Sequence, residues 1–264
     1  MPLPRITIVT PSYNQAAFLE RTLTSVLDQG YPDLEYLVLD GGSTDGSVAL
    51  IERYAGRLAW WRSGKDAGQA AAIREGFARA TGDVLAWLNS DDWYEPGALL
   101  AVGEAFARGG AEIVHGDVRY VDSVGRRLWD APMVLDERIL AYDSEYPAQP
   151  ALFWTRALYE KAGGLDPSFR FAMDFDLLVR LLRAGGRGRK LWRPLANFRL
   201  HAESKTTTIA AVGEEEVRRV RARYGWDRGP AALQFARRWS ARLSRFARDP
   251  RCIRTALESR LRAY

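Results

Sequence analysis

The chain has 264 residues and 47% of them are hydrophobic, so it is long enough to bury a sizeable core as one large α/β domain or as two domains. Its single cysteine excludes an intramolecular disulfide, and no apolar stretch near the start is long enough for a signal peptide or a membrane-spanning helix, so a cytoplasmic location is expected. The net charge of +5 is uneven, because residues 217–264 carry 14 arginines against three acidic residues and the rest of the chain is acidic. No nucleic-acid-binding motif accompanies this basic tail, so we expect no nucleic acid partner.

The first third of the chain has the pattern of strands that alternate with helices. β-branched and apolar runs predict the strands, and amphipathic segments that begin after turn-forming residues predict the helices. Such an alternation indicates a parallel sheet with right-handed crossovers. In chain order the predicted elements are a strand over residues 5–10, a helix over 15–29, a strand over 34–39, a helix over 47–55, a strand over 58–62, a helix that ends near residue 82 and a buried strand over 84–88.

Turn-forming or polar residues follow three of these strands, at Pro11, Asp40 and Asn89. The carboxyl ends of parallel strands meet at one edge of a sheet, where α/β proteins bind their ligands, so these residues are expected to line one nucleotide site. Glycines after Asp40 allow the backbone to come close to a ligand. The segment lacks the spacing of the dinucleotide fingerprint and of the P-loop, so Asp40 is expected to bind a ribose hydroxyl or a base edge.

The fourth predicted strand ends abruptly at two adjacent carboxylates, Asp91 and Asp92. Two like charges side by side are unfavourable unless something positive lies beside them. Carboxylate oxygens suit Mg²⁺ or Mn²⁺ carrying phosphates, so this turn is a candidate metal site. The alternative is an acidic turn that caps the helix expected after Pro96.

From residue 111 onward the predicted strands are shorter and more antiparallel in character. An amphipathic helix over residues 171–182 carries Asp174 and Asp176 in its first turn, where the helix dipole favours acids, so capping is an alternative to a chemical role. The predicted strands cover residues 111–114, 118–122 and 127–129, with a hairpin turn at 123–125, and then 150–154 and 195–201, while residues 136–149 are expected to be irregular.

Six short motifs occur in order within residues 5–208, at residues 8–14, 40–46, 66–69, 82–92, 173–177 and 198–201. Each motif is weak alone, but together they make the chain resemble the family-2 glycosyltransferases, inverting enzymes that use nucleotide-diphospho-sugars. The resemblance implies the GT-A fold, an α/β architecture with a Rossmann-like, mostly parallel sheet, helices on both faces and a smaller antiparallel acceptor-side region. It implies a catalytic domain over residues 1–210, followed by a basic helical tail over residues 211–264.

The resemblance also assigns a donor site. Pro11, Tyr13 and Asp40 would hold the base and ribose of the donor, with Asp66 and Gln69 nearby. The donor is expected to be a nucleotide-diphospho-sugar, with UDP as its nucleotide.

The metal and the catalytic base are assigned in the same way. Asn89-Ser90-Asp91 occupies the place of the family's Asp-x-Asp motif, so Asp91 would bind Mn²⁺ or Mg²⁺. Asn89 departs from the motif: its amide can hydrogen-bond the ribose but adds no charge. His201 matches a late histidine that reaches the metal or the diphosphate, with a structural hydrogen bond as the alternative. Asp174 lies where the family places the base that deprotonates the acceptor hydroxyl, whereas Asp176 is expected to be structural.

The expected reaction is sugar transfer to a saccharide or lipid-linked saccharide, in bacterial surface polysaccharide synthesis by analogy. Two other classes of protein are alternatives. A nucleotidyltransferase needs a glycine-rich, basic phosphate loop directly after the first strand, where this chain has Pro11-Ser12-Tyr13-Asn14. A non-catalytic sugar-nucleotide or membrane-binding module with a relict site is the other, and Asp91 together with Asp174 argues against it.

The tail contains a predicted amphipathic helix over residues 231–248. Its arginines fill most of the surface beside an apolar stripe, an arrangement typical of a helix that lies in a lipid interface. We expect peripheral contact with an anionic membrane, at the inner face of the cell membrane. The alternative is that the stripe packs on the acidic catalytic domain. The stripe consists of Ala232, Ala236, Trp239, Leu243 and Phe246.

Overall fold

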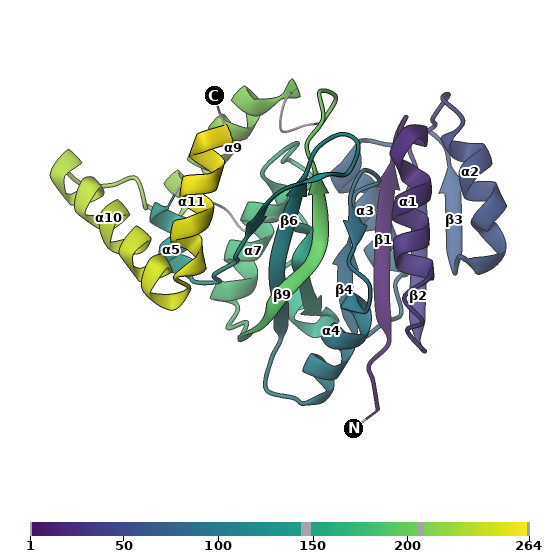
Figure 1. Ribbon diagram of the computed structural model, residues 1–264, viewed down its shortest axis with the longest axis horizontal. Helices are drawn as coiled ribbons and strands as arrows, with labels where there is room; N and C mark the ends of the chain where they lie inside the picture. The colour runs from purple at the N-terminus through teal and green to yellow at the C-terminus, as the bar shows by residue number, and fades with distance from the viewer. Residues whose placement is uncertain (1, 144–148, 205–207, 263–264) are drawn as a thin grey trace.

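The computed structural model describes residues 2–143, 149–204 and 208–262 (Figure 1). Its first half is the expected parallel sheet, in which four strands follow the order β3-β2-β1-β4. The elements are β1 (Ile6–Ser12), α1 (Ala16–Leu27), β2 (Leu34–Asp40), α2 (Ser47–Tyr54), the 3-10 turn η1 (Ala55–Arg57), β3 (Trp60–Ser63), α3 (Gln69–Arg79) and β4 (Val84–Trp87).

The second half continues the same sheet rather than forming a separate one. The full strand order is β3-β2-β1-β4-β8-β6-β9-β5, with β7 paired to β6. Antiparallel pairs join β4 to β8, β8 to β6, β6 to β7 and β9 to β5, whereas β6 and β9 run parallel. The α/β class and the parallel first half are confirmed, and the sheet as a whole is mixed. The strands are β5 (Trp93–Tyr94), β6 (Ile113–Val121), β7 (Arg127–Ala131), β8 (Leu152–Thr155) and β9 (Gly188–Arg199).

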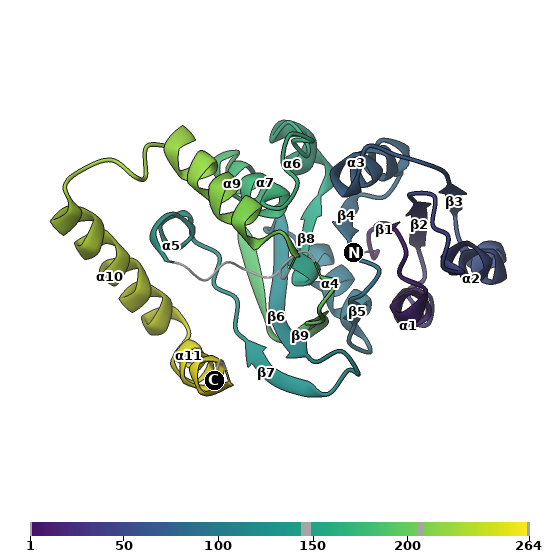
Figure 2. The same ribbon diagram turned by 90° about the horizontal axis from the view of Figure 1, so that it is seen from above.

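Helices cover both faces of this sheet, with α3, α6 and α7 on one face and α1 and α2 on the other (Figure 2). The remaining elements are α4 (Ala98–Ala107), α5 (Glu137–Tyr142), the 3-10 turn η2 (Gln149–Ala151), α6 (Arg156–Lys161), α7 (Met173–Arg183), α9 (Ala210–Arg223), α10 (Ala231–Arg248) and α11 (Arg251–Arg262).

An aromatic cluster joins the two halves of the sheet. Trp87 of β4 and Trp154 of β8 pack edge to face with ring centroids 5.5 Å apart, and Phe77 of α3 packs on both at 6.2–6.3 Å. Strand β4 is buried along its whole length, as its continuous apolar sequence predicted. Burial of such large rings fixes β8, and with it the second half, against the parallel strands.

Two local predictions are wrong, and each has a physical reason. The strands expected at residues 111–114 and 118–122 form the single strand β6, because Gly116 lets β9 come close where a Cβ would lie 2.4 Å from Leu195 Cγ. The stretch expected to be irregular, residues 136–149, contains α5. Asp136 caps it by accepting hydrogen bonds from the backbone N–H groups of Arg138 and Ile139. Residues 144–148 of that stretch lie outside the described part.

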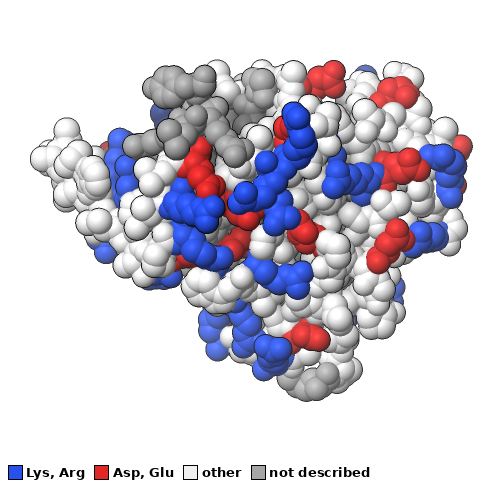
Figure 3. Space-filling view, viewed as in Figure 1, with Lys and Arg blue, Asp and Glu red and all other residues white. Residues whose placement is uncertain are grey.

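The C-terminal helices attach to the domain in two ways. Val217, Val220 and Trp226, on and just after α9, are buried in the main hydrophobic core. Helix α11 is held by a cluster of paired charges at its start, in which Lys190 Nζ lies 2.5 Å from Asp249 and Arg251 lies 2.7 Å from both Asp249 and Asp117. Figure 3 shows basic and acidic side chains side by side on this face.

Asp249 in this cluster remains ionised down to low pH. Burial opposes ionisation of Asp249, but hydrogen bonds from Arg251 and Lys190 outweigh it and lower the pKa to about 2. The stabilisation from this carboxylate is therefore present above its unfolded-state pKa of about 3.9 and is lost as the pH falls through about 2.

Within the described residues, no helix is both long and apolar enough to span a bilayer.

Candidate active site

A cleft of about 830 Å³ lies at the carboxyl ends of the parallel strands and extends into the second half of the sheet. The residues that line it come from loops far apart in the sequence, which the fold brings to one edge, as the strand order predicted. Of the predicted site residues, Asp40 and His201 are not among those that line the cleft. The ones that do are Pro11, Tyr13, Asp66, Gln69, Asn89, Asp91 and Asp174.

Hydrogen bonds join the loop after β1 to the loop after β2, at the end of the cleft that the parallel strands form. Asn14 adopts a left-handed backbone conformation, with φ at 52°, and its side-chain oxygen accepts a hydrogen bond from the N–H of Thr44. The N–H of Asn14 donates in return to Ser43 Oγ at 2.8 Å. An Asn tolerates this conformation better than most residues, which explains its place in the turn. These bonds fix the position of the neighbouring Tyr13, which is 62% exposed.

Gly41 lies between the side chains of Tyr13 and Asp66, which the family resemblance assigned to the donor site. A Cβ at this position would lie 3.3 Å from Asp66 Oδ2 and 3.3 Å from Tyr13 Cδ2. The Tyr13 ring and the Asp66 carboxylate therefore both lie close to the backbone at Gly41, where any side chain would crowd them.

Asp40 lies beneath this loop rather than in the cleft. Its carboxylate is fully buried and accepts hydrogen bonds from the N–H groups of Gly42 and Ser43 and from Ser63 Oγ. In this structure the side chain shapes the loop that carries Gly41, and its contact with base or ribose stays a prediction.

The acidic turn after β4 is held by residues near the C-terminal end of the domain. Asp91 Oδ2 lies 3.0 Å from His201 Nε2, so the fold brings together two predicted metal ligands that are 110 residues apart. The N–H of Arg199 donates to Asp92 Oδ1, and its guanidinium donates to the backbone oxygen of Asp91. Arg199 lies within the motif at residues 198–201, but the motif alone does not predict these contacts.

The repulsion between the adjacent carboxylates of Asp91 and Asp92 is reduced because the environment of Asp92 favours its neutral form. Asp92 is buried, and this burial together with the charge of Asp91 raises its pKa well above the usual value. The hydrogen bond from Arg199 offsets only part of the effect. Asp91 is the carboxylate of the pair that lines the cleft.

The donor set at this turn fits a divalent cation shared with a substrate. A carboxylate oxygen and an imidazole nitrogen lie within 3.0 Å of each other, and Mn²⁺ accepts both ligand types. Among the described residues no three His, Cys, Asp or Glu side chains form a cage for a metal, so a cation at this turn would need further oxygen ligands. Asn89, the departure from the acidic motif, accepts a hydrogen bond from Gln69 at 2.7 Å.

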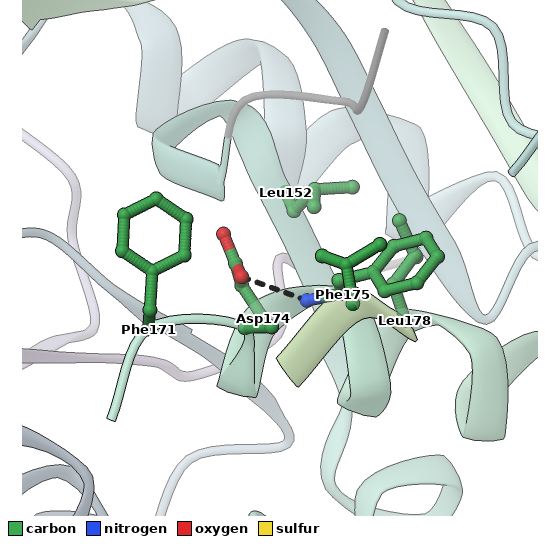
Figure 4. Close-up of a pocket in the computed structure, with 7 residues that line it drawn as sticks. Leu152, Phe171, Asp174, Phe175 and Leu178 are labelled. Carbon is green, nitrogen blue, oxygen red and sulfur yellow. Dashed lines mark hydrogen bonds between the residues drawn. The ribbon is translucent and has the colours of Figure 1, made fainter. Parts of the chain in front are cut away.

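Asp174 lies at the junction of the main cleft and a small apolar cavity of about 50 Å³. It belongs to the first turn of α7, and the N–H of Phe175 donates to its Oδ1 at 2.8 Å (Figure 4). Leu152 and Leu178 line the apolar side. Asp176, two residues on, is fully buried and paired with arginines of α7 and α9, in agreement with the structural role expected for it.

The loop that carries Asp174 is fastened by a residue that the sequence analysis missed. Glu216 of α9 accepts hydrogen bonds of 2.8–2.9 Å from the N–H groups of Arg170, Phe171 and Ala172, at the start of α7. Burial alone would raise the pKa of Glu216, but these bonds outweigh it and the net shift is downward. Glu216 thus caps α7 in place of a local N-cap side chain.

Known proteins that resemble this chain identify its family. Residues 7–163 match the family described as glycosyl transferase family 2. The chain belongs to glycosyltransferase family 2. Within this family it is 32% identical over 181 residues to an uncharacterised glycosyltransferase of Mycobacterium tuberculosis, a match that covers 67% of this chain and 68% of the relative.

Solved structures share the fold of this family-2 chain at low sequence identity. The Staphylococcus aureus protein TarS, residues 1–349 in complex with UDP-GlcNAc, has a TM-score of 0.66 at 16% identity over 92% of this chain and 73% of that one. The mannosyltransferase PcManGT of Pyrobaculum calidifontis, in complex with GDP-Man and Mn²⁺, has a TM-score of 0.65 at 18% identity over 100% of this chain and 82% of that one.

Removal of the Glu216 carboxylate is expected to impair this glycosyltransferase without touching the cleft. Glu216→Ala leaves three backbone N–H groups at the start of α7 without their partner, which should lower the free energy of unfolding by about 1–3 kcal/mol. The displaced Asp174 should lower kcat by about tenfold or more. Thermal denaturation and steady-state kinetics measure both effects.

The matched control is Glu215→Ala, because Glu215 is the exposed neighbour that pairs only with Arg218 among the described contacts. Its stability should change by about 0.5 kcal/mol or less. Equal behaviour of the two variants would contradict the capping role.

Proposed function

We propose that this family-2 glycosyltransferase is an inverting enzyme that transfers a sugar from a UDP-linked donor to a hydroxyl of a saccharide or lipid-linked saccharide. One observation carries the proposal: Tyr13, Asp66, Asp91 and Asp174 line a single cleft, and His201 lies directly against Asp91. The proposed nucleotide site, diphosphate site and acceptor base thus share one cleft, which supports a transfer reaction within it.

The proposed roles follow the chemistry of each group. The nucleobase lies between Tyr13 and Asp66, and Asn89 is placed to bind the ribose. When bound by Asp91 and His201, Mn²⁺ or Mg²⁺ supplies positive charge against the oxygens of the diphosphate. Asp174 takes the proton of the acceptor hydroxyl while that oxygen bonds to the anomeric carbon, and the bond from this carbon to the diphosphate breaks with inversion.

Calorimetry with UDP and GDP in the presence of Mn²⁺, followed by turnover of a panel of sugar nucleotides, tests this function. Binding of UDP with turnover of at least one UDP-sugar is the expected result. Tight binding with no turnover of any donor, with or without acceptor, would favour the non-catalytic module instead.

A role in surface polysaccharide synthesis is proposed on the name of a relative. The chain is 31% identical over 208 residues to the O-antigen biosynthesis protein RfbC of Myxococcus xanthus, of which it spans only 16%.

We further propose that the catalytic unit extends beyond the expected boundary at residue 210, to about Trp226, and that α10 and α11 form the tail. The arginine side of α10 packs on the domain, where Arg245 lies 2.9 Å from Asp143 and Arg248 lies 2.8 Å from Asp136. The alternative in which the apolar stripe packs inward is wrong, because Trp239 and Leu243 are 47% and 60% exposed.

The outward face of α10 is proposed to contact an anionic membrane over residues 231–248. The helix lies at the outer edge of the molecule in both views (Figures 1 and 2) and contains no acidic residue, so a second copy of it would be repelled. With Arg245 and Arg248 already paired, attachment should depend mainly on insertion of Phe235, Trp239 and Leu243.

The double substitution Trp239→Glu with Leu243→Glu should therefore abolish sedimentation with vesicles of mixed phosphatidylglycerol and phosphatidylcholine, while leaving donor binding unchanged. Leu100→Glu is the matched control, because Leu100 is 43% exposed, close to the 47% of Trp239, and belongs to α4, which lies apart from α10 (Figure 1). If the double variant sediments as the unchanged protein does, or if neither binds at low and physiological salt, the membrane proposal is wrong.

A further inference from the structure

Three aromatic rings meet at the ends of β6, β7 and β9. Tyr120 and Phe198 are register partners on the parallel strands β6 and β9, and both line the cleft. Their ring centroids are 5.2 Å apart and their planes are tilted by 47°. Trp129 of β7 stacks against Tyr120 at 4.9 Å with planes 16° apart. Trp129 therefore supports one face of the Tyr120 ring, and Tyr120 and Phe198 both contribute to the wall of the cleft.

This ring pair is tied to the turn that carries Asp91. Phe198 directly precedes Arg199, whose backbone N–H donates to the Asp92 carboxylate. The next residue, Leu200, donates its N–H to the backbone oxygen of Val121, which follows Tyr120. In the sheet, β6 and β9 are separated from β1 and β2 by β4 and β8. Tyr120 and Phe198 thus lie on the side of the cleft away from Tyr13 and Asp66.

The chemistry of this wall suits one face of a neutral sugar ring. Aromatic faces carry partial negative charge and attract the C–H edge groups of a flat, weakly polar partner, while also removing its apolar surface from water. The carboxylates of Asp174 and Glu203 line the same cleft. They can accept hydrogen bonds from sugar hydroxyls, and they repel an anionic group.

We propose that Tyr120 and Phe198 form the platform on which the acceptor sugar ring stacks, with Trp129 as the positioning residue behind Tyr120, so that the residue receiving the transferred sugar is a neutral glycoside. This inference rests on the proposed transferase function and adds the class of acceptor. A polyol phosphate lacks the apolar ring face, and both a polyol phosphate and a uronic acid carry negative charge that Asp174 and Glu203 repel.

Binding of simple glycosides tests the platform without knowledge of the natural acceptor. The probes are the methyl glycosides of glucose, galactose, mannose and N-acetylglucosamine, measured by saturation-transfer difference NMR on the protein with UDP and Mn²⁺. We expect at least one neutral glycoside to bind with a millimolar dissociation constant. Tyr120→Ala and Phe198→Ala should each weaken it about 3- to 10-fold, the range expected for loss of one aromatic contact. Tyr120→Phe should restore binding to within about twofold, because the ring is kept.

Two measurements separate a specific loss from general damage. The UDP dissociation constant should stay within about twofold in every variant, which also shows that each variant is folded. Trp192→Ala removes an exposed ring from the same strand as Phe198, outside the cleft, and should bind the glycosides as the unchanged protein does.

Three results would overturn the platform while leaving the proposed function intact. They are unchanged glycoside binding in Tyr120→Ala, no binding of any neutral glycoside by a protein that does bind UDP, and tighter binding of methyl glucuronide than of methyl glucoside. Failure of the unchanged protein to bind UDP would instead refute the proposed function itself.

Discussion

Asp174→Asn is expected to lower kcat by at least about 100-fold while the dissociation constant of the donor stays within a few-fold. The amide keeps the shape of the carboxylate and its hydrogen bond from Phe175, but it cannot take a proton from the acceptor hydroxyl. A base that acts on the acceptor contributes little to binding of the donor, so the two readouts should separate. Steady-state turnover and calorimetry with UDP measure them.

Asp176→Asn is the informative comparison, because Asp176 is two residues away on the same helix. Its carboxylate pairs with Arg180 and Arg223 in a buried site, so its loss should destabilise the fold by about 3–5 kcal/mol rather than remove a chemical step. If Asp174→Asn turned over normally and a folded Asp176→Asn did not, the base would have to be reassigned to Asp176.

Asp91→Ala is expected to abolish turnover and to remove the effect of Mn²⁺ on UDP affinity. Asp91 is the carboxylate of the acidic turn that both lines the cleft and lies against His201, so the variant retains one nitrogen donor and no carboxylate at this point. A single imidazole holds a hard cation poorly. Titration of UDP at increasing Mn²⁺ concentrations gives the readout.

Glu203→Gln serves as the control for Asp91, since Glu203 is another carboxylate that lines the same cleft. Its response to Mn²⁺ should match that of the unchanged protein. Mn²⁺-dependent UDP binding that survives in Asp91→Ala, or that disappears in Glu203→Gln, would place the cation elsewhere.

The features that were predicted well are those that neighbouring residues encode. The β-branched run at β1, the continuous apolar run at β4 and the glycines after Asp40 each restrict the backbone locally, so their structures follow from a few adjacent side chains. The order of strands and helices then leaves few ways to arrange the first half. The same order led to the cleft at the strand ends.

The features that were missed depend on partners distant in the sequence. Glu216 is an ordinary acidic residue in a charged helix, and only the fold shows that its carboxylate meets the start of α7 some 45 residues earlier. Arg199 likewise gains its role from the turn at Asp91, 108 residues away. No local pattern identifies Glu216, and the motif at residues 198–201 contains Arg199 without indicating what it contacts.

Helix α10 marks the division between the two kinds of information. The spacing of residues 231–248 already predicts a helix with an apolar stripe and an arginine side, because helical periodicity sets which residues share a face. Which of these faces turns inward depends on the side chains that the rest of the fold places beside the helix. The buried carboxylate of Asp143 needs a partner, and burying it without Arg245 would cost more than leaving Trp239 and Leu243 in water, so the charged face packs and the apolar face is exposed.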